Sequence, residues 1–87
     1  MNIEEKLKSL EGWIYDNNSK SIKKEFLFKS YLKTIAFVNA VAWIANKENH
    51  HPDLEVSFNK CLIKLTTHDE GGVSEQDFKL ALAINCL

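Results

Sequence analysis

The sequence predicts an α+β fold in which a four-stranded antiparallel sheet carries three helices on one face, in the order α-β-β-α-β-β-α. Two observations support this prediction. Two pairs of strand-like segments are each joined by turn-forming residues, which is typical of antiparallel hairpins. A long segment with helical apolar periodicity separates the pairs, and shorter helical segments lie toward both ends. The length of 87 residues fits one domain, spanning residues 1–87.

The N-terminal part of the chain is expected to form a helix followed by a hairpin. The helix is predicted at residues 3–10, with Asn2 as its cap. Its apolar face would be made by Ile3, Leu7 and Leu10. The hairpin has a short strand at residues 13–15, a run of turn formers at 16–19 and a second strand at 22–28.

The strongest periodic signal belongs to a helix that begins after Ser30 and runs to about residues 46–49. Its apolar stripe is made by Tyr31, Ile35, Val38, Ala42 and Ala45. Ser30 is a favourable N-cap because its hydroxyl can accept a hydrogen bond from a free backbone N–H. Pro52 disfavours helical geometry at His51, so the helix must end before this pair.

The remainder of the chain predicts a second hairpin and a last helix. Strands are expected at residues 54–58 and 61–66, with a turn at 59–60. Ser74 and Asp77 have the spacing of a capping box at the start of the last helix, so Asp77 is expected to be mainly structural. The aromatic residues expected in the core include Trp13, Trp43 and Phe58.

Composition excludes several classes of protein. Eleven lysines, no arginine and twelve acidic residues give a net charge of −1, which disfavours direct, sequence-specific reading of nucleic acid. The longest apolar stretch, residues 35–45, is too short to span a membrane, and no secretory signal precedes it. Cys61 and Cys86 lack CxxC spacing, which suits two buried or unreactive thiols in the cytoplasm. Residues 20–33 carry five lysines and predict either a solvated face or a docking surface for an acidic partner.

The three histidines are the candidate functional residues. His50 and His51 lie where the long helix ends, and His68 lies where the fourth strand ends. Functional residues concentrate in loops held by rigid elements, so these positions are informative. Three interpretations remain open at this point: surface or structural histidines, general acid–base catalysis, and a three-histidine metal site.

Residues 46–77 resemble the signature of the pterin-4a-carbinolamine dehydratases, a family also described as the dimerisation cofactor of a homeodomain factor. The signature has His-His-Pro, five residues, an aromatic, nine residues, a histidine, eight residues and an aspartate. The matching residues are His50, His51, Pro52, Phe58, His68 and Asp77. Gly12-Trp13 and the segment from Thr66 to His68 also look like the family.

The resemblance implies a hydro-lyase that removes water from a 4a-hydroxytetrahydropterin to give the quinonoid dihydropterin, in tetrahydropterin recycling. It implies histidine acid–base catalysis with no cofactor and no metal. The catalytic residues carried over are His50, His51 and His68, with His51 and His68 as the leading acid–base pair and His50 mainly a binding residue. The pterin-binding residues carried over are Asn49, His50, His51, Thr66, Thr67 and His68. A homodimer or homotetramer, joined through edge strands, is also implied.

One position departs from the family pattern. The family usually has a charged residue four positions before the first histidine, where this chain has Asn46. An acid there is expected to face His50 one helical turn on.

Two other functions compete with the dehydratase. One is a non-catalytic dimerisation or transcriptional cofactor, and the other is a three-histidine metal-binding protein.

Overall fold

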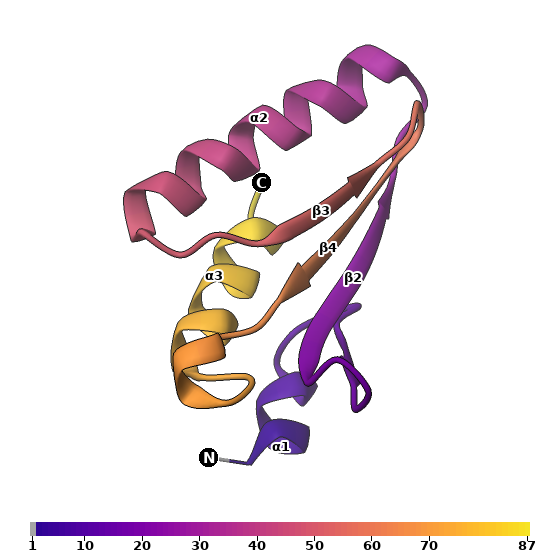
Figure 1. The fold of residues 1–87 in the computed structure, drawn as a ribbon. Coiled ribbons are helices and arrows are strands. Elements are labelled where there is room, and N and C mark those ends of the chain that lie inside the picture. The colour runs from indigo at the N-terminus through magenta and orange to yellow at the C-terminus, as the bar shows by residue number, and fades with distance from the viewer. Residues whose placement is uncertain (1) are drawn as a thin grey trace.

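The computed structural model describes residues 2–87 and has the α+β architecture that the sequence predicts (Figure 1). The elements are α1 (Ile3–Lys8), β1 (Ile14–Asp16), β2 (Ser21–Leu27), α2 (Tyr31–Glu48), β3 (Asp53–Val56), β4 (Lys60–Leu65), the 3₁₀ turn η1 (His68–Glu70) and α3 (Glu75–Asn85). The predicted order is confirmed, and the 3₁₀ turn is the one element that the sequence did not indicate.

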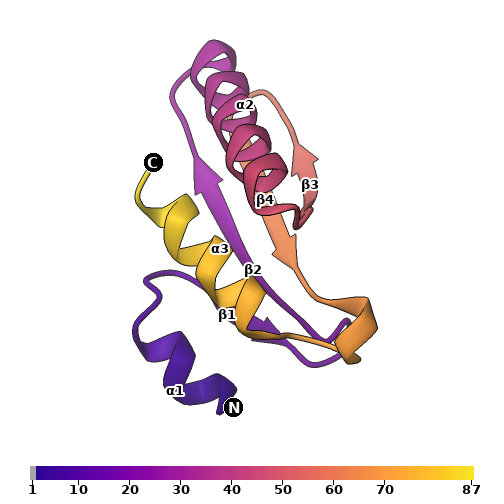
Figure 2. The same cartoon turned by 90° about the vertical axis from the view of Figure 1, so that its left-hand side faces the viewer.

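The sheet joins two hairpins through their inner strands. Its strand order is β1-β2-β4-β3, and every neighbouring pair is antiparallel. The central pair runs from Ile22 opposite Leu65 to Leu27 opposite Lys60. Helices α2 and α3 lie across one face of this sheet, and α1 lies beside β1 (Figure 2). The end of β4 therefore comes close to the start of α3, and the end of α2 leads directly into edge strand β3.

The core lies between the sheet and the two longer helices. Alternate residues of the central strands point inward, so Ile22, Ile63 and Leu65 are fully buried. Val41 and Ala45 from α2 and Phe78, Leu80, Ala81 and Ile84 from α3 cover them. Trp13 is also buried, as predicted, and its indole Nε1 donates a hydrogen bond of 2.9 Å to Asn85 Oδ1. This bond ties the segment before β1 to the last turn of α3.

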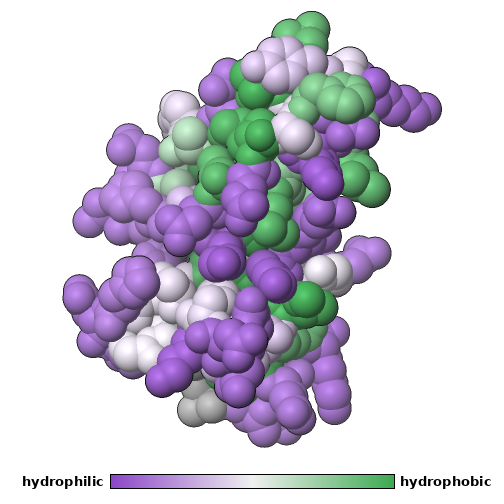
Figure 3. Space-filling view, turned by 45° about the vertical axis from the view of Figure 1, so that its right-hand side comes forward, coloured by the Kyte–Doolittle hydropathy of each residue, from purple (hydrophilic) through white to green (hydrophobic). Residues whose placement is uncertain are grey.

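Two aromatic residues expected in the core are exposed. Trp43 is 69% exposed, because it lies on the face of α2 opposite to the one that buries Val41 and Ala45. Phe58 is 65% exposed, because β3 ends at Val56 and Phe58 lies in the turn beyond it. Hydrophobic side chains gather at the end of the molecule where β2 runs into α2 (Figure 3). The prediction of a core position for Trp43 and Phe58 was wrong.

The lysine-rich run does not form one continuous surface. Lys23 pairs with Asp16 at 3.1 Å, and the hydrogen bond from Lys23 lowers the pKa of Asp16 to about 2. Lys24 points inward and donates to Glu11 O and Asn85 Oδ1. The other lysines, Lys20, Lys29 and Lys33, lie beyond opposite ends of β2. This arrangement separates the charges that a single docking surface for an acidic partner would need.

The two cysteines differ in environment. Cys61 is completely buried, and burial raises the pKa of its thiol, which keeps it protonated and unreactive. Cys86 is exposed at the end of α3, so burial is confirmed for Cys61 and does not apply to Cys86. Over residues 2–87, no helix has both the length and the apolar character needed to cross a bilayer.

Candidate active site

The end of α2 directs the first two histidines away from the helix axis. Asn49 adopts a left-handed conformation (φ 52°, ψ 41°). The N–H of Asn49 donates to Asn46 O and the N–H of His50 donates to Ala45 O, which together form a Schellman motif. His50 therefore lies outside the helix. The expectation that a residue at position 46 faces His50 one turn on was wrong, because that relation requires helical geometry through residue 50.

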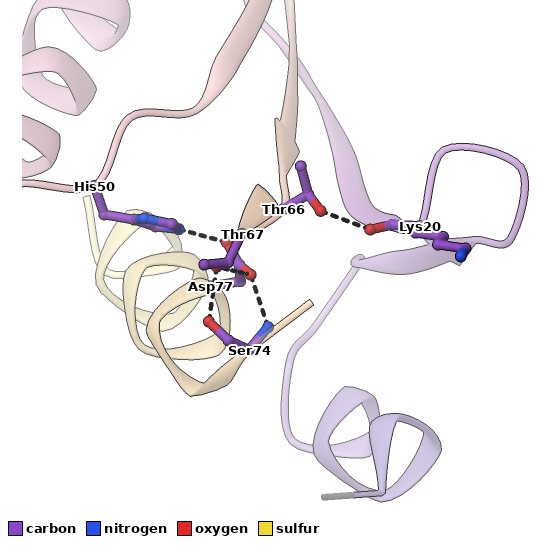
Figure 4. A network of polar contacts seen from close by, with 6 residues as sticks. All are labelled: Lys20, His50, Thr66, Thr67, Ser74 and Asp77. Carbon is purple, nitrogen blue, oxygen red and sulfur yellow. Dashed lines mark hydrogen bonds and ion pairs between the residues drawn. The ribbon is translucent and has the colours of Figure 1, made fainter. Parts of the chain in front are cut away.

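The end of β4 directs the third histidine. Thr67 pairs with Gly72 in an isolated antiparallel bridge, which closes the loop that contains η1. The hydroxyl of Thr66 donates a hydrogen bond of 2.7 Å to the backbone oxygen of Lys20, just before β2 (Figure 4). His68 is the first residue of η1, so its backbone is held by the bridge on one side and by the 3₁₀ turn on the other.

These two connections border one open cavity of about 320 Å³. All six residues assigned to binding or catalysis from the sequence line it: Asn49, His50, His51, Thr66, Thr67 and His68. Asp69 and Gln76 complete the wall and were not assigned from the sequence. The volume falls in the range of pockets that hold small organic ligands, and most of the lining groups can form hydrogen bonds.

A buried carboxylate fixes His50 at the side of this cavity. The side chain of Asp77 is completely buried, and its Oδ1 lies 2.5 Å from His50 Nε2. Its Oδ2 accepts hydrogen bonds from the Thr67 hydroxyl at 2.7 Å and from the Ser74 N–H at 2.8 Å (Figure 4). Because a carboxylate only accepts, Nε2–H of His50 is the donor, and this fixes the orientation of the ring.

Asp77 therefore has a second role that the sequence reasoning missed. Its bond to the Ser74 N–H confirms the predicted capping box. The contact with His50 joins residues 27 apart in the chain, so no local pattern could reveal it. The one sequence signal for this contact was the spacing of the family signature, which includes Asp77 together with the three histidines.

His51 and His68 are the uncommitted imidazoles of the cavity. Both are exposed, and neither forms an ion pair with another residue in the described part of the chain. Across residues 2–87 no group of three or more His, Cys, Asp or Glu side chains is arranged to hold a metal ion. The histidines thus share a cavity without converging as metal ligands, and two of them are free to contact a bound molecule.

The whole chain, residues 1–87, matches the family model described as pterin 4 alpha carbinolamine dehydratase. The chain belongs to this family. A protein of Nitrosospira multiformis named as a candidate pterin-4-alpha-carbinolamine dehydratase is 52% identical over 85 residues, which cover 98% of this chain and 74% of that protein.

One solved structure supports the same assignment, and a second shows the same fold. A crystal structure described as a transcriptional coactivator/pterin dehydratase from Brucella melitensis has a TM-score of 0.92 and 33% identity, covering 97% of this chain and 89% of that one. A pterin dehydratase-like protein, described as a RuBisCO assembly factor in the alpha-carboxysome, has a TM-score of 0.75 and 22% identity, covering 87% and 88%. The second likeness shows a shared fold.

Proposed function

We propose that this member of the pterin-4a-carbinolamine dehydratase family removes water from 4a-hydroxytetrahydropterin to give quinonoid dihydropterin. Residues 1–87 would act as one domain in the cytoplasm, in tetrahydropterin recycling. The observation that carries the proposal is one small-molecule cavity containing all three histidines, two of them uncommitted. Family membership supports the substrate class.

The reaction needs one acid and one base. The bond between C4a and the hydroxyl oxygen breaks, the oxygen takes a proton and leaves as water, and a ring N–H loses its proton as a C=N bond forms. Neutral imidazole can accept the ring proton, and imidazolium can protonate the leaving oxygen. We assign these two roles to His51 and His68, because both line the cavity and both are free of protein partners. No metal or further cofactor is required by this scheme.

His50 has a different part in this proposal. Its Nε2–H is committed to Asp77, so the ring offers only the Nδ1 side and its face to a ligand. We therefore assign His50 mainly to substrate binding, together with Asn49, Thr66 and Thr67. Asp77 is a positioning residue, because it acts on the substrate through His50.

The direct test is stopped-flow decay of a 4a-hydroxytetrahydropterin with and without the protein, over a range of pH. We expect acceleration with a bell-shaped dependence between about pH 5 and 8, the interval in which histidine ordinarily changes charge. Activity falls at low pH because the base becomes protonated, and at high pH because the acid loses its proton. After subtraction of the uncatalysed rate, a flat profile would indicate that other groups transfer the protons.

A second candidate function is a dimerisation or coactivator module. It is favoured by the similarity to the Brucella protein described as a transcriptional coactivator, and by exposed apolar side chains near the β2–α2 junction. These are Leu27, Tyr31, Leu32 and Phe58, exposed by 70, 62, 79 and 65%. Thr34 donates to Phe58 O, so the β3–β4 turn packs against this same end of α2. Clustered apolar side chains of this kind mark interaction sites.

We propose that a second copy of this chain covers these side chains or an edge strand, giving a homodimer or homotetramer. Sedimentation equilibrium should then give two or four times the mass of one chain. Phe58→Ser, which changes an exposed turn residue, should lower that mass if the apolar end is the interface, and leave it unchanged if edge strand β3 is. A single-chain mass for the unaltered protein would contradict both arrangements.

A further inference from the structure

The cavity wall formed by η1 carries a carboxylate that the acid–base scheme does not use. Asp69 lines the cavity beside His68 and is exposed. It takes part in none of the ion pairs formed among residues 2–87. This distinguishes it from Asp77, whose two oxygens are occupied by three donors. Asp69 is therefore the anionic group of the cavity that is free to bind a ligand.

Three of the other polar side chains around the cavity already have protein partners. The Thr66 hydroxyl donates to Lys20 O, the Thr67 hydroxyl donates to Asp77, and His50 Nε2 is held by Asp77. The Gln76 amide also lines the cavity, but an amide has one acceptor oxygen, whereas a carboxylate has two in one plane. The Asp69 carboxylate can therefore accept two adjacent N–H donors.

A pterin ring presents such a pair of donors. Its pyrimidine edge carries the ring N3–H next to the 2-amino group, and this edge lies across the ring from C4a. A carboxylate can accept both bonds in parallel, which gives a short, charge-assisted contact with defined orientation. Asp69 comes from η1, whereas His50 and His51 come from the α2–β3 connection. Binding of the pyrimidine edge at Asp69 would leave C4a free to face the imidazoles.

We propose that Asp69 recognises the 2-amino-4-oxo pyrimidine edge of the substrate and so determines specificity for pterins. This inference rests on the proposed dehydratase function and adds a specificity residue to it. Asp69 takes no part in proton transfer, so its contribution belongs to substrate binding. Neighbouring Glu70 does not line this cavity, and it provides a matched control on the same turn.

The experiment compares the unaltered protein, Asp69→Asn and Glu70→Gln in equilibrium binding. The two probes are 7,8-dihydropterin and 7,8-dihydrolumazine, which has an oxo group in place of the 2-amino group. Loss of a charge-assisted pair should weaken dihydropterin binding by Asp69→Asn roughly 10–100-fold. Dihydrolumazine binding should change much less, so the preference for pterin collapses. Glu70→Gln, with the same loss of charge, should keep both affinities.

Dehydratase kinetics on the same three proteins separates this inference from the function beneath it. Asp69→Asn should raise KM with a much smaller effect on kcat, because the interaction is made equally before and during the reaction. If the unaltered protein is active and Asp69→Asn retains its KM and its pterin preference, the proposed role of Asp69 is wrong. The dehydratase proposal would then still stand. An unaltered protein that neither binds dihydropterin nor accelerates dehydration would overturn the dehydratase proposal and this inference together.

Discussion

Replacing His51 or His68 by alanine is expected to lower the catalysed dehydration rate roughly 10²–10⁴-fold in each case, as the loss of a general acid or base normally does. Both imidazoles line the cavity and are exposed, so their removal should leave the fold intact. The measurement is stopped-flow decay of the 4a-hydroxytetrahydropterin at saturating protein. Near-native circular dichroism of each variant excludes unfolding as the cause of a lost rate.

Two further variants make this prediction specific. Asn46→Ala changes an exposed residue of the last turn of α2 that does not line the cavity, so it should keep the native rate. His50→Ala should raise KM more than it lowers kcat, because we assign His50 mainly to binding. Full activity in both His51→Ala and His68→Ala would show that the catalytic assignment is wrong.

Replacing Asp77 by alanine is expected to lower the free energy of unfolding by roughly 3 kcal/mol, because three donors lose a fully buried acceptor. Small domains are stable by only about 5–15 kcal/mol, so this is a large fraction of the total. Urea unfolding followed by fluorescence of Trp13 and Trp43 measures the change. Glu75→Gln is the matched control: its ion pair with Lys6 is exposed, and about 0.5 kcal/mol or less should be lost.

The effect of Asp77 on activity can be isolated with a variant that keeps its shape. Asp77→Asn should raise KM, because His50 is no longer held by a carboxylate. In a protein that already carries His50→Ala, the same substitution should have little further effect on KM, since Asp77 acts on the substrate through His50. Additive changes in KM would mean that Asp77 reaches the ligand by another route.

Local chemistry was sufficient to predict the α-helices and the β-strands. The apolar period of α2, its Ser30 cap and Pro52 bounded the helix to within a few residues of Tyr31–Glu48. Alternation and turn residues located both hairpins. These features depend on neighbours in the chain, and so a single sequence contains them. Trp43 and Phe58 were misplaced because apolar character alone does not say which face of an element is covered.

The sequence by itself determined the fold class, the element order and the candidate histidines, through periodicity, caps and the spacing of the signature. The tertiary structure alone decided three things: that α2, β4 and α3 bring these histidines to one cavity, that Asp77 holds His50, and that Asp69 faces the same space. The physical reason is that each of these relations joins segments separated in the chain. Such contacts depend on how the two hairpins and the helices pack together, which no local pattern encodes.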